Sequence, residues 1–156
     1  MRTLRLLLLL LPCTLFAQQD GVLKEYAFAK AEQLQQQEIR PYLVFLHTDW
    51  CKYCRGMEQN TFTDPAVIRA LNSDYYFIPF NAESTEKIQF ADRSFKYMPT
   101  GTKTGMHELA TALGTIAGNV SFPTVVVLNP QYEIIFQAAS FLSAAQLLEI
   151  LKRGHD

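Results

Sequence analysis

The stretch HTDWCKYCRGME, residues 47–58, places Cys51 and Cys54 three positions apart and directly after Trp50. It overlaps PYLVFLHT, residues 41–48, an almost unbroken apolar run that is typical of a strand buried on both faces. From Cys51 onward the strand pattern stops and a helix is expected, with Cys51 in its first turn and Cys54 one turn on. The sequence therefore predicts that both cysteines lie where a buried strand passes into a helix.

A helix start favours a thiolate, because unpaired backbone N–H groups and the positive end of the helix dipole stabilise the negative sulfur. Lys52 and Arg55 add positive charge close to the pair. We therefore expect Cys51 to be an exposed nucleophile. Cys54, on the same side of the helix, is placed to attack the mixed disulfide that Cys51 forms with a substrate.

Two other interpretations of the cysteine pair stay open at this point. A zinc site needs four ligands, commonly from two such pairs, and His47, His107 and His155 show no ligand spacing. An inert structural disulfide is the second alternative, but so short a loop constrains the unfolded chain very little. We expect a redox pair, with no metal and no cofactor beyond the cysteines themselves.

The first residues have the order of a secretory signal peptide. Residues 1–17 contain two arginines, an apolar run of 11 residues and a final small residue, Ala17. The run is shorter than the roughly 20 residues that a membrane-spanning helix needs. We expect cleavage after Ala17, which leaves residues 18–156 as one domain. An uncleaved anchor and a lipid attached to Cys13 are the alternatives.

Composition and charge limit the possible partners. The length of 156 residues suits one domain. The formal net charge is −1, and the sequence contains no run of basic residues of the kind that binds nucleic acid. No segment resembles a dimerisation element, so a monomer is expected. In an exported protein, a lone pair of cysteines can be oxidised, and its redox state must be managed by partners.

The remaining sequence alternates between helical and strand patterns. Before and after the cysteines, we expect an amphipathic helix at 23–40, a helix at 65–74 begun by Asp64 and Pro65, and a strand at 75–83. Short strands at Lys87–Phe90 and Ser94–Tyr97 follow, and then a loop and a helix that ends at Gly114. The chain closes with paired strands at 122–130 and 132–139 and a last helix at 143–154 capped by Ser143. The order strand, helix, strand implies parallel pairing of 41–48 with 75–83.

The segment FLHTDWCKYC, followed about 70 residues later by SFPTVVVLNP, resembles the thioredoxin superfamily. The stretch DWCKYCRGMEQNTFTDPAVIRAL, residues 49–71, is similar to exported thioredoxin-like domains such as the C-terminal domain of the thiol carrier DsbD. This resemblance implies an α/β thioredoxin fold, with a central mixed β-sheet flanked by helices and an inserted hairpin and helix between about 84 and 120. It also implies a cis peptide bond before Pro123, next to the cysteines, with the backbone of Phe122 offered to an extended substrate.

The resemblance further implies an exported thiol–disulfide oxidoreductase, most simply a periplasmic reductase of protein disulfides. Trp50, Lys52 and Tyr53 would support substrate binding beside the cysteines. Electrons would come from a membrane thiol carrier. A disulfide oxidase or isomerase, and a binding protein that uses the thioredoxin fold without catalysis, remain the alternatives.

One position departs from the family pattern. Many thioredoxins carry a buried acid on the strand six residues before the first cysteine, and Phe45 stands there in this chain. The proton of the second cysteine must therefore leave by another route, through water or Glu58. His47 is expected to end its strand with an ordinary hydrogen bond, with tuning of the thiolate as the alternative, and His107 is expected near the surface.

Overall fold

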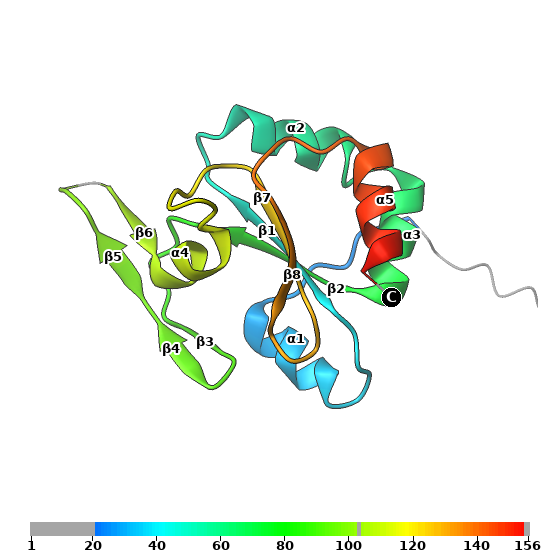
Figure 1. Cartoon of the computed structure of the whole chain (residues 1–156), viewed down its shortest axis with the longest axis horizontal. Coiled ribbons are helices and arrows are strands. Elements are labelled where there is room, and N and C mark those ends of the chain that lie inside the picture. Colours follow the sequence, from blue (N-terminus) through cyan, green and yellow to red (C-terminus); the bar gives the residue numbers. More distant parts are fainter. Residues whose placement is uncertain (1–20, 103, 155–156) are drawn as a thin grey trace, which may run out of the picture.

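The computed structural model of the chain describes residues 21–102 and 104–154 (Figure 1). The predicted signal peptide at 1–17 and Cys13 lie outside these described residues. Within them, no helix combines the length and the apolar character required for a membrane span.

The described chain forms a four-stranded mixed sheet with the order β2-β1-β7-β8. Its strands are β1 (Tyr42–His47), β2 (Tyr76–Asn81), β7 (Thr124–Leu128) and β8 (Ile134–Ala138). The predicted parallel pairing of β1 with β2 is confirmed, and so is the antiparallel hairpin of β7 with β8. Strand β7 returns antiparallel beside β1, which makes β1 a central strand with all side chains but that of His47 buried.

Helices cover both faces of the sheet. One face carries α2 (Lys52–Asn60), α3 (Pro65–Asp74) and α5 (Ala144–Arg153), and the other carries α1 (Phe28–Gln35) and α4 (Glu108–Gly114). Alternate side chains of β1 divide between these layers, because Leu43 and Phe45 pack with α2 and α5 whereas Val44 packs with α1 and α4. Both cysteines belong to the first of these two cores.

The helix ends follow the predicted capping chemistry. Asp64 accepts hydrogen bonds from the backbone N–H groups of Ala66 and Val67 at the start of α3. Ser143 and Gln146 form a reciprocal capping box at the start of α5. These caps are local, and this explains why the sequence locates both helices correctly.

The first helix is shorter than the predicted range of 23–40 at both ends, because it begins at Phe28 and ends at Gln35. Ahead of it, Leu23 packs against the core under α2 while Tyr26 packs against the opposite core. An extended segment can pass from one face of a sheet to the other, whereas an amphipathic helix buries a single stripe. The backbone N–H of Tyr26 also donates to the carbonyl of Phe77 at 2.9 Å, which attaches this segment to β2.

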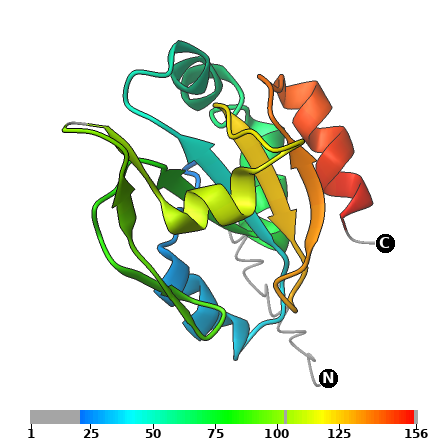
Figure 2. The same ribbon diagram turned by 60° about the vertical axis from the view of Figure 1, so that its left-hand side comes forward.

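The region between β2 and α4 contains two hairpins where the sequence predicted one. The predicted hairpin forms from β3 (Ile88–Phe90) and β4 (Arg93–Phe95), joined through Ala91 and Asp92, which both have positive φ. The second pairs β5 (Tyr97–Pro99) with β6 (Gly105–His107). Gly105 lies so close to the ring of Tyr97 that a Cβ would clash. Figures 1 and 2 show the β5–β6 hairpin next to α4, and the β3–β4 hairpin packs against α1.

Candidate active site

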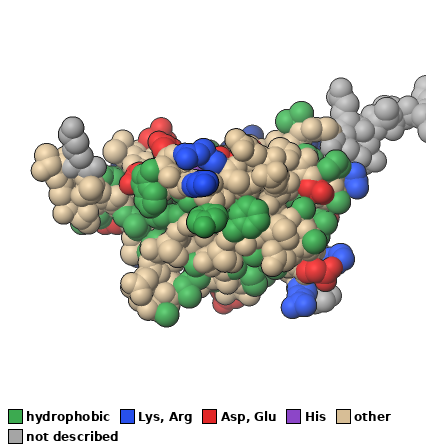
Figure 3. All heavy atoms as spheres, turned by 90° about the horizontal axis from the view of Figure 1, so that it is seen from above, with side chains coloured by type: hydrophobic (Ala, Val, Ile, Leu, Met, Phe, Trp, Pro, Cys, Tyr) green, Lys and Arg blue, Asp and Glu red, His purple; other side chains and the backbone are tan. Residues whose placement is uncertain are grey.

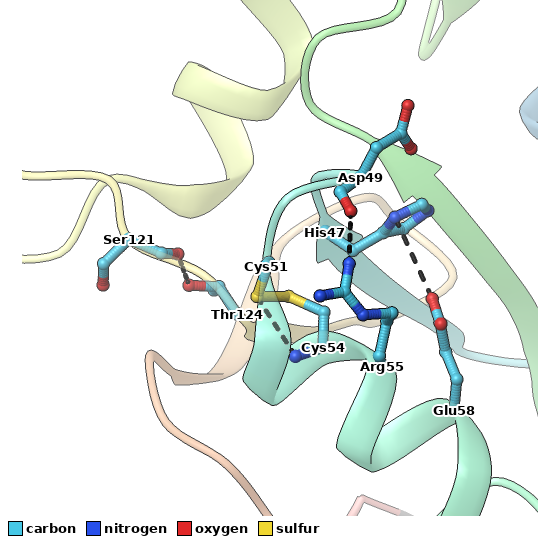
Figure 4. The surroundings of a disulfide bond; sticks show 8 residues. All are labelled: His47, Asp49, Cys51, Cys54, Arg55, Glu58, Ser121 and Thr124. Carbon is cyan, nitrogen blue, oxygen red and sulfur yellow. Dashed lines mark hydrogen bonds and ion pairs between the residues drawn. A yellow bond between two sulfur atoms is a disulfide. The ribbon is translucent and has the colours of Figure 1, made fainter.

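The two cysteines form a disulfide at the first turn of α2, just beyond the end of β1 (Figure 4). Cys51 is the N-cap of α2, one position before the helical residues in which the sequence placed it. Its Sγ accepts a hydrogen bond from the backbone N–H of Cys54 at 3.1 Å. One of the unpaired N–H groups at the helix start therefore points at the sulfur, as a stabilised thiolate requires.

Access to the pair differs from the prediction. Cys51 is only 4% exposed and Cys54 is 1% exposed, so the expected exposed nucleophile is buried when the disulfide is closed. The adjacent side chains of Trp50 and Tyr53 are exposed instead, at 64% and 67%.

Trp50 is held in place on both sides. Its Nε1 donates to a carboxylate oxygen of Glu83 at 3.1 Å. Its ring lies edge-to-face with that of Phe122, with 6.1 Å between the ring centroids. Exposed aromatic rings that are fixed in this way offer apolar contact area with little loss of side-chain entropy.

The loop before β7 lies beside the disulfide, although it is about 70 residues away in sequence. Antiparallel pairing places Thr124 opposite Leu46 near the end of β1, and Figure 4 shows Thr124 beside Cys51, with Ser121 farther along the same loop. The peptide bond between Phe122 and Pro123 is cis, and Phe122 packs on the core that contains both cysteines. Residues 121–124 therefore form one wall of the candidate site.

The segment around the end of α2 packs against the segment that precedes α5. The hydroxyl of Thr61 donates to the carbonyl of Leu142 at 2.6 Å, and Phe62 is buried in the core below α2. Gly56 faces the ring of Phe141, which a Cβ would approach to 3.3 Å. These contacts fix the far end of α2 against the segment that leads into α5.

Basic side chains occupy the same face as the aromatic ones. Arg55 donates to the backbone carbonyl of Asp49 at 2.6 Å, which ties α2 to the loop in front of Cys51, while Lys52 is exposed. Figure 3, which looks down on the α2 side, shows basic side chains next to a group of hydrophobic ones. The candidate site is thus an apolar surface bordered by the basic side chains of Lys52 and Arg55 and by the acidic side chain of Glu83.

His47 faces a carboxylate and not the ordinary hydrogen-bond partner that the sequence suggested. Its Nδ1 lies 4.0 Å from a carboxylate oxygen of Glu58 on α2, and its ring stacks on Phe45 at 5.5 Å. Burial lowers the pKa of His47, although the charges of Glu58, Asp49 and Glu25 act in the opposite direction. The sequence contains both residues, but no local pattern indicates that they meet.

The expectation that His107 lies near the surface is wrong. Its side chain is fully buried and caps α4, with Nδ1 accepting from the backbone N–H of Leu109 at 3.1 Å. The other ring nitrogen, Nε2, lies 2.9 Å from the carbonyl of Glu86, and the ring packs edge-on against Phe80. The position directly before a helical pattern was the available signal for this capping role. In the part of the chain that the structure describes, no three His, Cys, Asp or Glu side chains form a metal-binding group.

Known proteins resemble the chain in sequence pattern and in fold. Residues 28–155 match the family model of the thioredoxin-like domain. A thioredoxin from Thermus thermophilus superposes with a TM-score of 0.60 at 23% identity, covering 84% of this chain and 85% of its own. The C-terminal domain of DsbD from Neisseria meningitidis, in its reduced form, gives 0.55 at 17% identity, covering 81% and 91%.

A disulphide isomerase from Xylella fastidiosa Temecula1 also shares the fold, with a TM-score of 0.55 at 15% identity over 82% of this chain and 88% of its own. At these identities the similarity concerns the fold alone. No curated protein matches the sequence significantly.

Proposed function

This chain belongs to the thioredoxin-like domain family and, with its CxxC pair, is a thiol–disulfide oxidoreductase; we propose that it works as an exported reductase of protein disulfides. The observation that carries the proposal is the position of the Cys51–Cys54 disulfide. It lies at a helix start, where a thiolate is stabilised, next to the loop of Phe122 and Pro123 and between exposed aromatic side chains.

In the proposed reaction, the thiolate of reduced Cys51 attacks one sulfur of a substrate disulfide. A bond forms between Cys51 and that sulfur, and the second substrate sulfur leaves as a thiolate that takes up a proton. Cys54 then loses its proton and attacks Cys51 Sγ, which releases the first substrate sulfur. The substrate ends with two thiols and the protein with the disulfide seen in the structure.

The surrounding residues receive roles that fit their positions. Trp50 and Tyr53, both largely exposed, would contact apolar parts of the substrate, and exposed Lys52 would contact acidic parts. The segment of Phe122 and Pro123 would bind an extended substrate strand through its backbone, next to the sulfur that is attacked. These contacts hold the substrate disulfide in line with Cys51.

Export and the source of electrons belong to the same proposal. The order of charged, apolar and small residues at 1–17 supports export, most simply to a periplasm. There the oxidised pair must be reduced again by a dithiol, which we propose is that of a membrane thiol carrier. The protein would accept those electrons by the same two exchange steps in reverse.

The reduction potential of the Cys51–Cys54 pair, measured against a glutathione or dithiothreitol couple, tests the direction. A value near that of thioredoxin, about −270 mV, supports a reductase, whereas a value near about −120 mV would overturn it in favour of an oxidase. Reduction of insulin, with Cys51→Ser as the matched control, tests turnover. Equal rates for wild type and variant would contradict the enzyme and favour a binding protein.

A further inference from the structure

An open cavity of about 760 Å³ lies between α2, α3 and the segment at 21–25 that precedes α1. Residues of β1 and β2 form the rest of its lining. His47 and Glu58 belong to this lining, and Figure 4 shows them on the opposite side of the disulfide from Ser121 and Thr124. The cavity is therefore separate from the surface on which we place the protein substrate, and its volume falls within the range of about 300–1,000 Å³ that small-molecule sites have.

The deep part of the cavity is aromatic. Phe45, Phe62 and Phe77 line it and are buried. Their rings form a row, with 4.8 Å between the centroids of Phe45 and Phe62 and 4.8 Å between those of Phe62 and Phe77. His47 adds a fourth ring, which stacks on Phe45 at 5.5 Å. Clustered aromatic rings favour a ligand with an apolar body, and such clusters recur in sites that bind organic ammonium ions.

The exposed rim of the cavity is acidic. Glu25 and Glu58 line it and are exposed, and among the described residues in the lining none is a lysine or an arginine. A carboxylate oxygen of Glu58 lies 4.0 Å from Nδ1 of His47, and the charges of Glu25 and Asp49 also act on this ring. The guanidinium of Arg55 binds the backbone carbonyl of Asp49 and does not line the cavity. The rim therefore favours a positive charge over a negative one.

His47 does not oppose this preference at neutral pH. Burial has the largest influence on its imidazole and lowers its pKa below the ordinary value of 6.5, so the ring is neutral near pH 7. A neutral imidazole can donate one hydrogen bond and accept another, so it does not repel a cation. The amide of Asn81 is already engaged, since it donates to Asp49 and accepts from the backbone N–H of Glu83.

The outer wall of the cavity is fixed by contacts to α3. The side chain of Asn72 accepts from the backbone N–H of Lys24 at 2.8 Å and donates to the carbonyl of Val22 at 2.9 Å. Leu23, between these two residues, packs on the core below α2. The wall is thus formed before any ligand binds, which lowers the entropy that binding would cost.

We propose that this cavity binds a small organic cation, in which a protonated or quaternary amine is attached to an aromatic or branched apolar body. The apolar body would lie in the deep part, next to Phe62 and Ile68, and the positive nitrogen at the rim, next to Glu25 and Glu58. The lysine side chain of a partner protein carries the same charge, but its unbranched chain fills far less of the volume. The site is independent of disulfide exchange, because it uses neither cysteine.

Three probes with the same ring and different charges test the site: benzylamine, benzyl alcohol and benzoate. Each is titrated into the oxidised protein near neutral pH at low salt, and NMR follows the imidazole of His47, the methyl groups of Ile68 and the indole N–H of Trp50. Benzylamine should shift the His47 and Ile68 signals and bind about fivefold more tightly than benzyl alcohol, as two partly solvated ion pairs allow. Benzoate should bind most weakly, and high salt should remove the preference for benzylamine.

Two charge-removing variants separate the rim from the aromatic part. Glu25→Gln and Glu58→Gln should each weaken benzylamine binding about threefold and leave benzyl alcohol binding unchanged, because each removes one charge and conserves the shape of the side chain. Glu86→Gln is the matched control, since Glu86 is an exposed acid that lines a different cavity. It should bind all three probes as the wild type does.

Three results would overturn the inference. The first is equal affinity of the wild type for the three probes, or no binding of any of them. The second is a shift of the Trp50 signal without a shift of the His47 signal, which would place benzylamine on the substrate surface. The third is tighter binding of N-acetyl-lysine amide than of benzylamine, which would assign the cavity to a lysine side chain of a partner protein. Failure of the proposed function would appear separately, in the insulin assay.

Discussion

Helices α2 and α4 both begin at a buried side chain that accepts a hydrogen bond from the first turn of the helix, and the two starts differ in what surrounds that side chain. At α2, the sulfur of Cys51 accepts from a backbone N–H at 3.1 Å, and at α4 the Nδ1 of His107 does so at the same distance. Cys51 is bordered by exposed Trp50 and Tyr53 and by the loop before β7. His107 instead has Phe80 against its ring and a second partner at Nε2.

This difference shows how one capping geometry can serve chemistry at one helix and stability at the other. At Cys51 the backbone N–H stabilises a thiolate, and a second cysteine lies next to it, so this helix start can serve disulfide exchange. At His107 both ring nitrogens have partners and no surface is exposed, so the same geometry connects α4 to the loop after β2.

The largest effect is expected at the start of α2. Cys54→Ser should lower turnover in insulin reduction by about a thousandfold or more, because the mixed disulfide on Cys51 can no longer be resolved from within the protein. The covalent complex should be visible on a non-reducing gel. Cys51→Ser should lose turnover as well but form no such complex, and a trapped complex in that variant would show that Cys54 is the attacking residue.

The second effect is expected at α4. His107→Ala removes a buried ring and leaves the N–H of Leu109 without its acceptor, so the free energy of unfolding should fall by about 3 kcal/mol. Denaturation in urea measures this. Activity per folded molecule should be unchanged, and His107→Asn, which retains a side-chain acceptor, should recover part of the loss. Loss of activity without loss of stability would show that His107 takes part in the reaction, and would contradict its purely structural role at the start of α4.

A smaller effect is expected at Trp50. Trp50→Ala should lower kcat/KM for a protein disulfide about tenfold, equivalent to about 1.4 kcal/mol, because the substrate loses its aromatic contact beside Cys51. Stability should change by less than about 0.5 kcal/mol, since the side chain is largely exposed. Glu83→Gln leaves the ring in place and should have a weaker effect. Unchanged steady-state kinetics in Trp50→Ala would show that substrates bind elsewhere.

The smallest effect concerns pH. The folded-state pKa of His47 is below its ordinary value of 6.5, so protonation favours the unfolded chain. The contribution of His47 to stability is therefore complete above about pH 6.5 and is lost as the pH falls through the lowered folded-state pKa. Urea midpoints at about pH 7.5 and about pH 5.5 should differ more in wild type than in His47→Phe. Identical pH dependence in both proteins would contradict the direction of the shift.

Much of the fold follows from short-range patterns in the sequence. The buried strand before the cysteines, the caps at Asp64 and Ser143, and the parallel pairing of β1 with β2 were all predicted. The second hairpin was not predicted, because its strands are only three residues long and Pro99 and Gly105 both weaken a strand pattern. The start of α1 was placed too early because the apolar residues ahead of Phe28 pack on two different faces.

For the candidate site, the identity and chemistry of the reacting groups follow from the local sequence. The CxxC spacing and the change from a strand pattern to a helix pattern place Cys51 and Cys54 at a helix start. Both features can be read from the sequence because each depends only on residues a few positions away. The tertiary structure alone decided that Cys51 is buried, that His107 caps α4 inside the core, and that His47 faces Glu58. These properties arise where separate strands and helices pack against one another, and contacts between distant segments leave no periodic pattern along the chain.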